Sequence, residues 1–292
     1  MLKVNDLSKT YDKDVKALNG VSLTIPKGMF GLLGPNGAGK SSLMRTIATL
    51  QQADSGSIIF DGIDVSKQPH LLRTRLGYLP QDFDVYPRIS AYDLLDHLAI
   101  LKGVSNKKLR KESVEGLLSQ TNLWTARKKA VSNFSGGMKQ RFGIAQALIG
   151  DPDLIIVDEP TAGLDPEERN RFHNLLASIG ENKVVILSTH IVDDVEELCS
   201  NMAVLAAGKI QLVGDPMDVV KGLQGRVWRK FILKDELQLH RDKFDVISTR
   251  LKAGKTLVHV LSDEQPCETF EQLSPDLEDV YFSILFNSRK VA

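Results

Sequence analysis

Alternating apolar and polar residues predict strands at the start of the chain, followed by one strand–loop–helix unit. The alternation is clear over residues 21–25, and residues 2–30 as a whole are predicted to be rich in strands. An apolar run over residues 29–33 is followed by a glycine-rich loop and then by a predicted helix over residues 41–50. Residues 56–65 are predicted to form further short strands.

The middle of the chain has a different spacing. Leucines recur at helical spacing over residues 94–101, so the stretch at 89–150 is predicted to be wholly helical. Beyond it, an apolar run is typical of a strand buried on both faces of a parallel sheet. The elements predicted there are a strand at 153–157, a helix at 167–179, a strand at 183–187 and a helix at 191–199. This order predicts an α/β fold into which the helical stretch is inserted.

The last part of the chain is predicted to be a small α+β appendage. A linker rich in glycine and proline over residues 214–225 precedes predicted strands at 227–233 and 256–261. Ser274-Pro275-Asp276 suits the start of a final helix, because proline is tolerated in a first turn. The predicted division is a first domain of residues 1–217, with its helical subdomain at about 89–150, and an accessory domain of residues 218–292.

The composition excludes several classes of protein. Lys and Arg together number 37, as do Asp and Glu, so the chain lacks the overall basic field typical of nucleic-acid binders. The two cysteines, Cys199 and Cys267, form neither a disulfide framework nor a zinc-binding spacing. No stretch approaches the roughly 18 consecutive apolar residues that a membrane helix requires, so we expect no spanning helix.

The glycine-rich loop has the chemistry of a phosphate-binding site. Its sequence, Gly34-x-x-x-x-Gly39-Lys40-Ser41, matches the phosphate-loop pattern in full. Backbone N–H groups can surround phosphate oxygens there, and the following helix directs its positive N-terminal end to the same place. We expect Lys40 to lie between the β- and γ-phosphates, Ser41 to bind Mg²⁺ and Ser42 to contact the α-phosphate. The alternative is an ordinary glycine turn, which the predicted flanking strand and helix disfavour. The residues predicted to bind the nucleotide here are Gly34, Pro35, Asn36, Gly37, Ala38, Gly39, Lys40, Ser41 and Ser42.

Two acidic residues, Asp158 and Glu159, end the buried strand. In open α/β sheets, ligands bind beyond the carboxyl ends of the strands. Asp158 is therefore expected to hold Mg²⁺ through water, as in phosphate-loop NTPases, and Glu159 to take a proton from the attacking water. Such a pair taken alone is usually a solvated turn, and the glycine loop makes the functional interpretation the stronger one.

Three motifs around this strand resemble those of one family. They are Asn133-Phe134-Ser135-Gly136-Gly137-Met138-Lys139-Gln140-Arg141, Asp158-Glu159-Pro160-Thr161 and Gly163-Leu164-Asp165-Pro166. Together with the phosphate loop they resemble, in content and in order, the nucleotide-binding subunit of ABC transporters. The resemblance covers residues 1 to about 217. It implies a P-loop NTPase (RecA-like) core with an N-terminal antiparallel β subdomain, and it implies ATP and Mg²⁺ as ligands.

The resemblance also implies roles for single residues. Tyr11, which lies 23 residues before Gly34, resembles the aromatic residue that stacks on adenine. Gln81 resembles the glutamine that touches Mg²⁺ or the attacking water and senses the membrane subunit. His190 resembles the histidine that contacts the γ-phosphate, and Asp165 resembles the acid that communicates between two ATP sites. For each of these residues taken alone, ordinary packing or a solvated position is the alternative.

The signature segment departs from the family's usual Leu-Ser-Gly-Gly-Gln at both ends. Phe134 keeps an apolar anchor, whereas Met138 lacks an amide that could hydrogen-bond near the ribose or the phosphates. Ser135, with the N–H groups of Gly136 and Gly137, can still receive a γ-phosphate at a helix start. We therefore expect the segment to function.

The resemblance implies two kinds of partner. In the family, two subunits pair head to tail, and each ATP is closed by the Ser135–Gly137 segment of the other copy. A second ATP-binding subunit, in a homodimer, and a separate membrane-embedded permease are therefore expected, with the chain peripheral on the cytoplasmic side of the cell membrane. The permease contact is predicted near residues 81–92, at Asp82, Phe83, Val85, Tyr86, Pro87 and Arg88.

Several functions share these motifs. The region of Gln81 and the tail motif at residues 275–281 resemble the branch that exports drugs, polysaccharides or lipids. An importer subunit has the same catalytic motifs and is the first alternative. A non-transport ABC ATPase would need an insertion or a second cassette that the sequence lacks, and a phosphate-loop kinase or GTPase is disfavoured by residues 134–138. No nucleic acid is expected as a partner, and the tail could either stabilise the dimer or regulate it.

Overall fold

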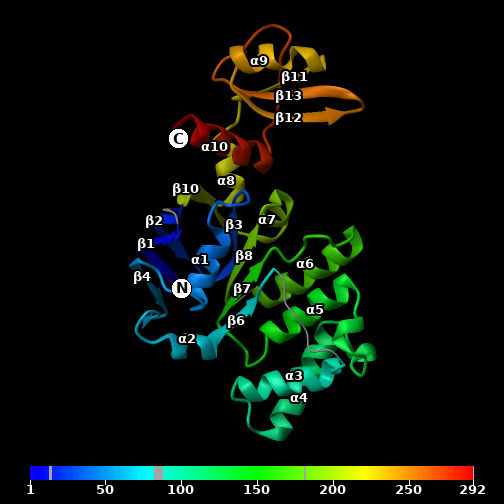
Figure 1. Cartoon of the computed structure of the whole chain (residues 1–292). Helices are drawn as coiled ribbons and strands as arrows, with labels where there is room; N and C mark the ends of the chain where they lie inside the picture. Colours follow the sequence, from blue (N-terminus) through cyan, green and yellow to red (C-terminus); the bar gives the residue numbers. More distant parts are fainter. Residues whose placement is uncertain (13–14, 82–87, 181, 292) are drawn as a thin grey trace.

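The N-terminal part of the chain folds as an antiparallel sheet. The computed structural model describes residues 1–12, 15–81, 88–180 and 182–291 (Figure 1). The sheet has the order β2-β1-β4-β5, with β1 (Leu2–Tyr11), β2 (Val15–Ile25), β4 (Ser55–Phe60) and β5 (Ile63–Asp64). Apolar residues at 21–25 are buried and the polar residues between them are exposed, as the alternation predicts. The expected N-terminal β subdomain is confirmed.

A six-stranded sheet forms the centre of the molecule, in the order β10-β9-β3-β8-β7-β6. Its strands are β3 (Gly28–Leu33), β6 (Leu76–Leu79), β7 (Leu154–Asp158), β8 (Val184–Thr189), β9 (Asn201–Ala206) and β10 (Lys209–Gly214). All neighbours are parallel except β9 and β10. Every residue of β7 and β8 is buried, which explains their continuous apolar sequences.

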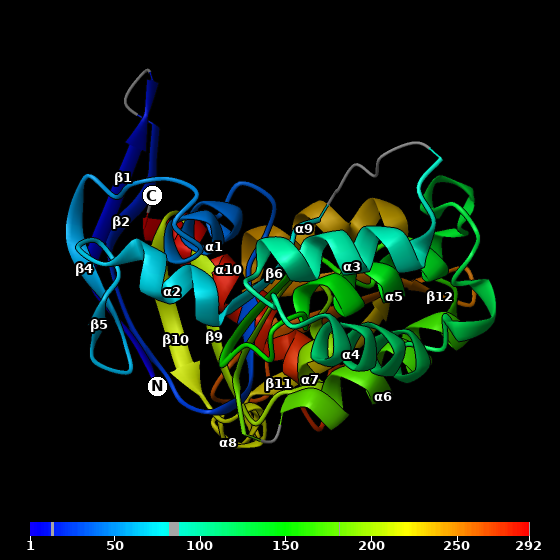
Figure 2. The same ribbon diagram turned by 90° about the horizontal axis from the view of Figure 1, so that it is seen from below.

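The central sheet separates two apolar cores. Alternate residues of its strands point to opposite faces, so Leu32 and Ile156 belong to one core while Leu33 and Val157 belong to the other. The first core contains α1 (Lys40–Ile47), part of α2 (Pro69–Arg75) and the N-terminal sheet. The second core contains the helices of the inserted segment. Figures 1 and 2 both show α1 and α2 on the side of the sheet away from α3, α4 and α5.

The inserted segment is helical, as predicted for residues 89–150. Its helices are α3 (Ala91–Leu101), α4 (Lys107–Gln120) and α5 (Gly136–Ala147), with short 3-10 helices at Trp124–Ala126 and Val131–Asn133. The starts are fixed by side-chain caps, because Ser90 accepts a hydrogen bond from the Asp93 N–H and Asn106 accepts from the Leu109 N–H. Two more helices, α6 (Pro166–Gly180) and α7 (Val192–Leu198), cover the same face and lie where the sequence predicts them.

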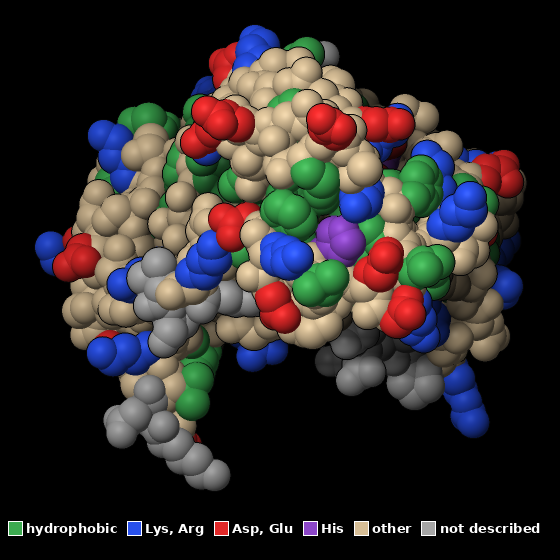
Figure 3. All heavy atoms as spheres, turned by 90° about the horizontal axis from the view of Figure 1, so that it is seen from above, with side chains coloured by type: hydrophobic (Ala, Val, Ile, Leu, Met, Phe, Trp, Pro, Cys, Tyr) green, Lys and Arg blue, Asp and Glu red, His purple; other side chains and the backbone are tan. Residues whose placement is uncertain are grey.

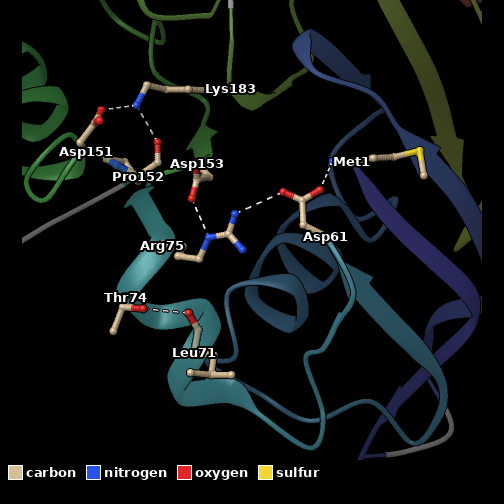
Figure 4. Close-up of polar contacts among 9 residues, drawn as sticks. All are labelled: Met1, Asp61, Leu71, Thr74, Arg75, Asp151, Pro152, Asp153 and Lys183. Carbon is tan, nitrogen blue, oxygen red and sulfur yellow. Dashed lines mark hydrogen bonds and ion pairs between the residues drawn. The ribbon is translucent and has the colours of Figure 1, made fainter.

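An arginine joins the two sheets at the edge opposite the carboxyl ends of the strands (Figure 4). Arg75 Nε is 2.6 Å from Asp153 Oδ2, and its Nη2 is 3.3 Å from Asp61 Oδ2. Asp61 follows β4 and Asp153 precedes β7, so one side chain links the end of a strand in the N-terminal sheet to the start of one in the central sheet. Lys183 pairs with Asp151 on the same side and fixes the start of β8.

The C-terminal part has a third sheet, with the order β12-β13-β11-β14. Its elements are β11 (Val227–Ile232), a 3-10 helix at Lys234–Glu236, α9 (Leu237–Lys243), β12 (Val246–Lys252), β13 (Lys255–Leu261) and β14 (Glu271–Gln272). The predicted strands at 227–233 and 256–261 are present, and β12 and α9 were not predicted. The prediction of a linker at 214–225 is wrong in part. Asp215 accepts from the Met217 N–H and caps a helix there, α8 (Pro216–Lys221).

The last helix, α10 (Leu277–Val291), packs on the first part of the chain rather than only on the third sheet. Leu277, Val280 and Tyr281 lie in the same core as α5 and α7, whereas the sheet has a small core of its own around Val258 and Phe270. Figure 1 shows α10 between α8 and the third sheet, above α7. The two parts of the chain therefore share one core through this helix.

The surface of the third sheet and α9 carries acidic and basic side chains interspersed with apolar ones (Figure 3). Phe231, Leu233 and Leu251 are among the large apolar side chains exposed in this part. Over the described residues, every helix is too short or too polar to span a bilayer.

Candidate active site

The glycine-rich loop connects β3 to α1 at the carboxyl edge of the central sheet. Gly39 is the residue before α1 and has φ +108°, and a Cβ atom there would lie 2.3 Å from the carbonyl oxygen of Ala17. A Cβ atom on Gly34 would lie 2.4 Å from the carbonyl oxygen of Leu205. Glycine is required at both positions because the loop lies directly against neighbouring backbone. The loop is thus held close to strands on either side of it.

Lys40 is buried within this loop, with a side chain that is only 6% exposed. Its Nζ donates to the carbonyl oxygen of Gly34 at 2.6 Å and lies 3.3 Å from Glu159 Oε1. An ammonium group removed from water requires partners of this kind. The arrangement places one positive charge where the loop, the start of α1 and the end of β7 meet.

Asp158, at the end of β7, has features of a cation ligand. Its side chain is buried, and its Oδ1 atom has no hydrogen-bond partner among the described residues. Burial raises the pKa of Asp158, whereas the nearby hydroxyls of Ser188 and Ser41 act in the opposite direction. An unpartnered carboxylate oxygen close to the Ser41 hydroxyl fits Mg²⁺, which prefers oxygen ligands. No group of three metal-binding side chains exists in the described part of the chain, so phosphate and water would have to complete the coordination.

Glu159 lies in an unusual backbone conformation next to His190. Its φ is +50°, and its N–H donates to the carbonyl oxygen of Ser188 at 2.8 Å. The second oxygen of its carboxylate, Oε2, is 2.6 Å from His190 Nδ1. Positive φ is strained for a residue with a side chain and is common at functional sites. Lys40, Glu159 and His190 therefore form one contact group, although they are far apart in the sequence.

The signature segment is built around the start of α5. Ser135 caps this helix by accepting a hydrogen bond from the Met138 N–H, and Phe134 is anchored against Phe142 with ring centroids 6.2 Å apart. Gly136 is exposed, and a Cβ atom there would have nothing within 4 Å. A Cβ atom on Gly137 would lie 2.5 Å from Glu168 Oε2.

Asp165 lies beside this segment at the start of α6. It is exposed, and its Oδ1 accepts a hydrogen bond from the Glu168 N–H at 2.9 Å. Because Glu168 also lies against Gly137, the starts of α5 and α6 adjoin each other. Both belong to the face of the central sheet opposite α1, and no hydrogen bond or ion pair among the described residues joins Ser135, Gly136 or Gly137 to the phosphate loop.

Two further residues were predicted for the site, Tyr11 beside the phosphate loop and Gln81 after β6. The Tyr11 hydroxyl donates to Gln51 Oε1 at 2.7 Å and is 3.2 Å from Ser42 Oγ, and 42% of the side chain is exposed. Gln81 follows β6 and is exposed. The predicted permease contacts Asp82, Phe83, Val85, Tyr86 and Pro87 lie outside the described residues, whereas Arg88 is described and has φ +68°.

The sequence-based reasoning missed one buried acidic residue near this site. Asp194 is on α7, four residues after His190, and is fully buried. Four of the seven residues of α7 are acidic, and the available signal was that Asp194 lies at helical spacing from Ile191 and Leu198, on the apolar face of the helix.

Comparisons with known proteins agree with the motifs. The family described as "ABC transporter" matches residues 18–162. The linearmycin resistance ATP-binding protein LnrL of Bacillus subtilis is 34% identical over 77% of this chain and 72% of its own length. The Nod factor export ATP-binding protein I of Rhizobium etli is 32% identical over 96% of this chain and 92% of its own length. Among solved structures, the dimeric structure of a bacterial ABC transporter cassette has a TM-score of 0.68 and 25% identity, over 74% of this chain and 98% of that one.

Proposed function

The chain belongs to the family of ABC transporter ATP-binding subunits, and from this premise we propose that it powers export by closing two copies around ATP and reopening them on hydrolysis. As a member of this family the chain is an ATPase, and the predicted P-loop NTPase fold is confirmed. The observation that carries the proposal is the contact group of Lys40, Glu159 and His190 beside the phosphate loop.

Binding of ATP would use groups that the structure already holds at one edge of the sheet. Backbone N–H groups of residues 36–41 and the start of α1 would surround the phosphates, and Lys40 would move its charge from Glu159 to the β- and γ-phosphates. Mg²⁺ would be held by Ser41, Asp158 and Gln81, and it would neutralise charge on the phosphates. Tyr11, which already contacts Ser42, would lie under the adenine.

Hydrolysis would use the two side chains that meet at the end of β7. Glu159 orients a water and accepts its proton as the water oxygen attacks the γ-phosphorus, while the bond from that phosphorus to the bridging oxygen breaks and ADP leaves. His190 would contact the γ-phosphate. In the structure each oxygen of the Glu159 carboxylate has a cationic or imidazole neighbour, so movement of Lys40 and His190 towards the phosphates frees the carboxylate for this role.

The second half of each site would come from another copy of the chain. Ser135 and Gly136 are exposed at a helix start that no contact connects to the phosphate loop of the same chain, within the residues that the structure describes. A helix start with free N–H groups is an anion-binding site. The Ser135–Gly137 segment of a second copy would therefore cover the γ-phosphate, and the exposed Asp165 would lie between the two sites.

Export through a separate permease is the transport direction that we propose. Two of the relatives are a linearmycin resistance protein and a Nod factor export protein. A drug, lipid or polysaccharide is the proposed class of cargo, which the permease would bind. The chain would be peripheral on the cytoplasmic side of the membrane, with residues 81–92 as the proposed contact with the permease.

Glu159→Gln is the decisive test of the mechanism. The variant keeps the shape of the side chain and loses its basicity, so we expect ATP-dependent pairing without turnover, measured by light scattering and phosphate release. The unaltered chain with ATP is the control and should pair transiently. Turnover at the unaltered rate would show that Glu159 is not the base. ATP binding without pairing would contradict the proposed ATP-dependent dimer.

Co-purification tests the transport role. We expect a membrane-spanning protein to accompany the tagged chain in detergent extracts. Stimulation of ATP hydrolysis by nucleic acid, or dependence on an external solute-binding protein, would favour a non-transport ATPase or an importer respectively.

A further inference from the structure

Asp194 is a fully buried carboxylate that the proposed mechanism leaves without a role. Its side chain is 0% exposed, and it lies on α7, four residues after His190. Taking a charge out of water is costly, and an apolar residue of similar volume in such a place is often neutral or stabilising for the fold. Packing of α7 alone therefore does not account for an acid at this position.

Four side chains from three segments converge on this carboxylate. Its Oδ2 accepts hydrogen bonds from Thr161 Oγ1 at 2.5 Å and from Thr189 Oγ1 at 3.4 Å. Its Oδ1 accepts from Arg169 Nε at 2.8 Å and is 2.9 Å from His173 Nε2. Both oxygens are thus occupied, and the charge is balanced by the Arg169 guanidinium.

The partners come from the segments that carry the proposed catalytic side chains. Thr161 lies two residues after Glu159. Thr189 directly precedes His190, and its hydroxyl also accepts from the Ile191 N–H at 3.0 Å. Arg169 is on α6, whose start carries Asp165. One carboxylate therefore links the backbone around the base, the backbone around the histidine and the helix at the edge of the signature segment.

Such a link has a mechanical consequence. Hydrogen bonds to a buried charge are strong and directional, so the segments that share it cannot shift independently without leaving the charge unpaired. The distance between Glu159 and His190 is set by backbone that Asp194 holds on both sides.

We propose that Asp194 is a positioning residue for ATP hydrolysis, which fixes the segment of Glu159, the segment of His190 and α6 relative to one another. The inference rests on the proposed roles of Glu159 and His190. It predicts that loss of the Asp194 contacts lowers the rate of the chemical step and spares nucleotide binding, because the phosphate loop has no contact with Asp194 among the described residues.

Asp194→Asn tests the inference directly, because it keeps the volume and removes the charge. We expect kcat for ATP to fall by about 10- to 100-fold, as when a residue that orients a metal ligand is lost, with the affinity for ATP within about twofold of the unaltered chain. Asp193→Asn is the matched control. Asp193 is the preceding residue, is largely exposed and lies 3.8 Å from the same arginine, and its substitution should leave kcat unchanged.

A second pair of variants keeps the inference testable if Asp194→Asn does not fold. Thr161→Val preserves the shape of the buried side chain and removes the hydroxyl, whereas Thr161→Ser keeps the hydroxyl and leaves a small cavity. A role in positioning predicts that kcat falls in the valine variant and is retained in the serine variant. A merely structural role predicts that the valine variant loses melting temperature but keeps kcat when assayed well below that temperature, and that result would overturn the inference.

Controls separate this inference from the proposed function. Thr121→Val removes a hydroxyl that is equally buried but bonds Leu117 in the helical subdomain, so it should lower stability without changing kcat. If the unaltered chain hydrolyses no ATP, the proposed function fails. If His190→Ala is inactive while Asp194→Asn and Thr161→Val both turn over ATP at the unaltered rate, only the inference about Asp194 fails.

Discussion

The phosphate loop and the signature segment are both glycine-containing helix starts, but they differ in how closely the rest of the chain packs against them. Gly39 has φ +108° and lies directly against the carbonyl oxygen of Ala17, and Lys40 is already bonded within the loop. Gly136 faces open space, and Ser135 bonds only the first turn of its own helix. In the proposed mechanism the two segments are halves of one ATP site, of which the phosphate loop is the formed half and the signature segment the exposed half.

If the proposal is correct, a single chain binds nucleotide and needs a second copy to hydrolyse it efficiently. The formed half supplies the charge and the carboxylates, and the exposed half supplies a helix start directed towards solvent. A subunit with this division can couple ATP binding to association, because the exposed half gains its anion only when a second copy brings it. The variants below separate the two halves.

Mixing two inactive variants is the strongest test and has the largest expected effect. Lys40→Met disables the formed half and Ser135→Arg the exposed half, so each variant alone should lose ATP hydrolysis completely. In an equal mixture, half of the dimers are mixed and each has one intact composite site, so about a quarter of the unaltered activity should return. The measurement is phosphate release at increasing ratios of the two chains.

The mixture also defines what would contradict the comparison. If both halves of a site came from one chain, mixing could not restore an intact site. Absence of recovery, with dimers of the two tagged chains shown by pull-down, would therefore count against partner-completed sites.

Replacing Gly39 or Gly136 by alanine distinguishes the two halves and has the next largest expected effect. Gly39→Ala should weaken ATP binding to the isolated chain by roughly tenfold or more, because a strained backbone conformation costs about 1–3 kcal/mol and the added Cβ meets backbone. Gly136→Ala adds a methyl group in open space, so the isolated chain should bind ATP normally and lose turnover in the pair. Isothermal titration and phosphate release measure the two effects, and equal losses of binding would contradict the assignment.

The sequence predicts the local features of both halves well, because their signals are local. The spacing around Gly34 and Lys40, the apolar run before Asp158 and the helical stretch around Ser135 each need only neighbouring residues. The contacts of Glu159 with Lys40 and His190 depend on strand order in the sheet, which the family resemblance implies and the pattern alone does not fix. Asp194 was not predicted, because its proposed role depends on contacts with side chains from three segments that are separated in the sequence.

In the C-terminal part of the chain, too, local sequence patterns predicted only some of the elements. Strand β12 was missed because two adjacent apolar residues, Val246 and Ile247, are followed by two adjacent polar ones, Ser248 and Thr249, so its start does not alternate. A linker was predicted where Asp215 caps α8. The final helix was predicted from its start at residues 274–276, but a helix start does not say which core the helix joins. In the structure Leu277 and Val280 join the core of the first domain.

Acidification should weaken the formed half more than the exposed half. Burial raises the pKa of Asp158, so this carboxyl is protonated at a higher pH than an ordinary aspartate. Since Mg²⁺ requires the ionised form, the gain in ATP affinity from Mg²⁺ should fall as the pH is lowered, by up to about tenfold per pH unit below the pKa. Titrations with and without Mg²⁺ at several pH values measure it.

The matched control for the pH effect is Asp158→Asn, which removes the titrating group. Its ATP affinity should show little dependence on Mg²⁺ at any pH in the series. An unchanged pH dependence of the Mg²⁺ effect in this variant would assign it to another group.

Met138→Gln tests the smallest difference between the halves. Met138 follows the signature glycines and packs against the main core, so glutamine adds an amide near the bound phosphates and loses part of an apolar contact. We expect turnover to rise by about two- to fivefold, as for one additional hydrogen bond of ~0.5–1 kcal/mol, with unchanged ATP affinity of the isolated chain and a lower melting temperature. Met138→Leu keeps the apolar contact without the amide and should leave turnover unchanged. An equal rise in both variants would show that the amide is not the cause, and the exposed half would then be complete with methionine.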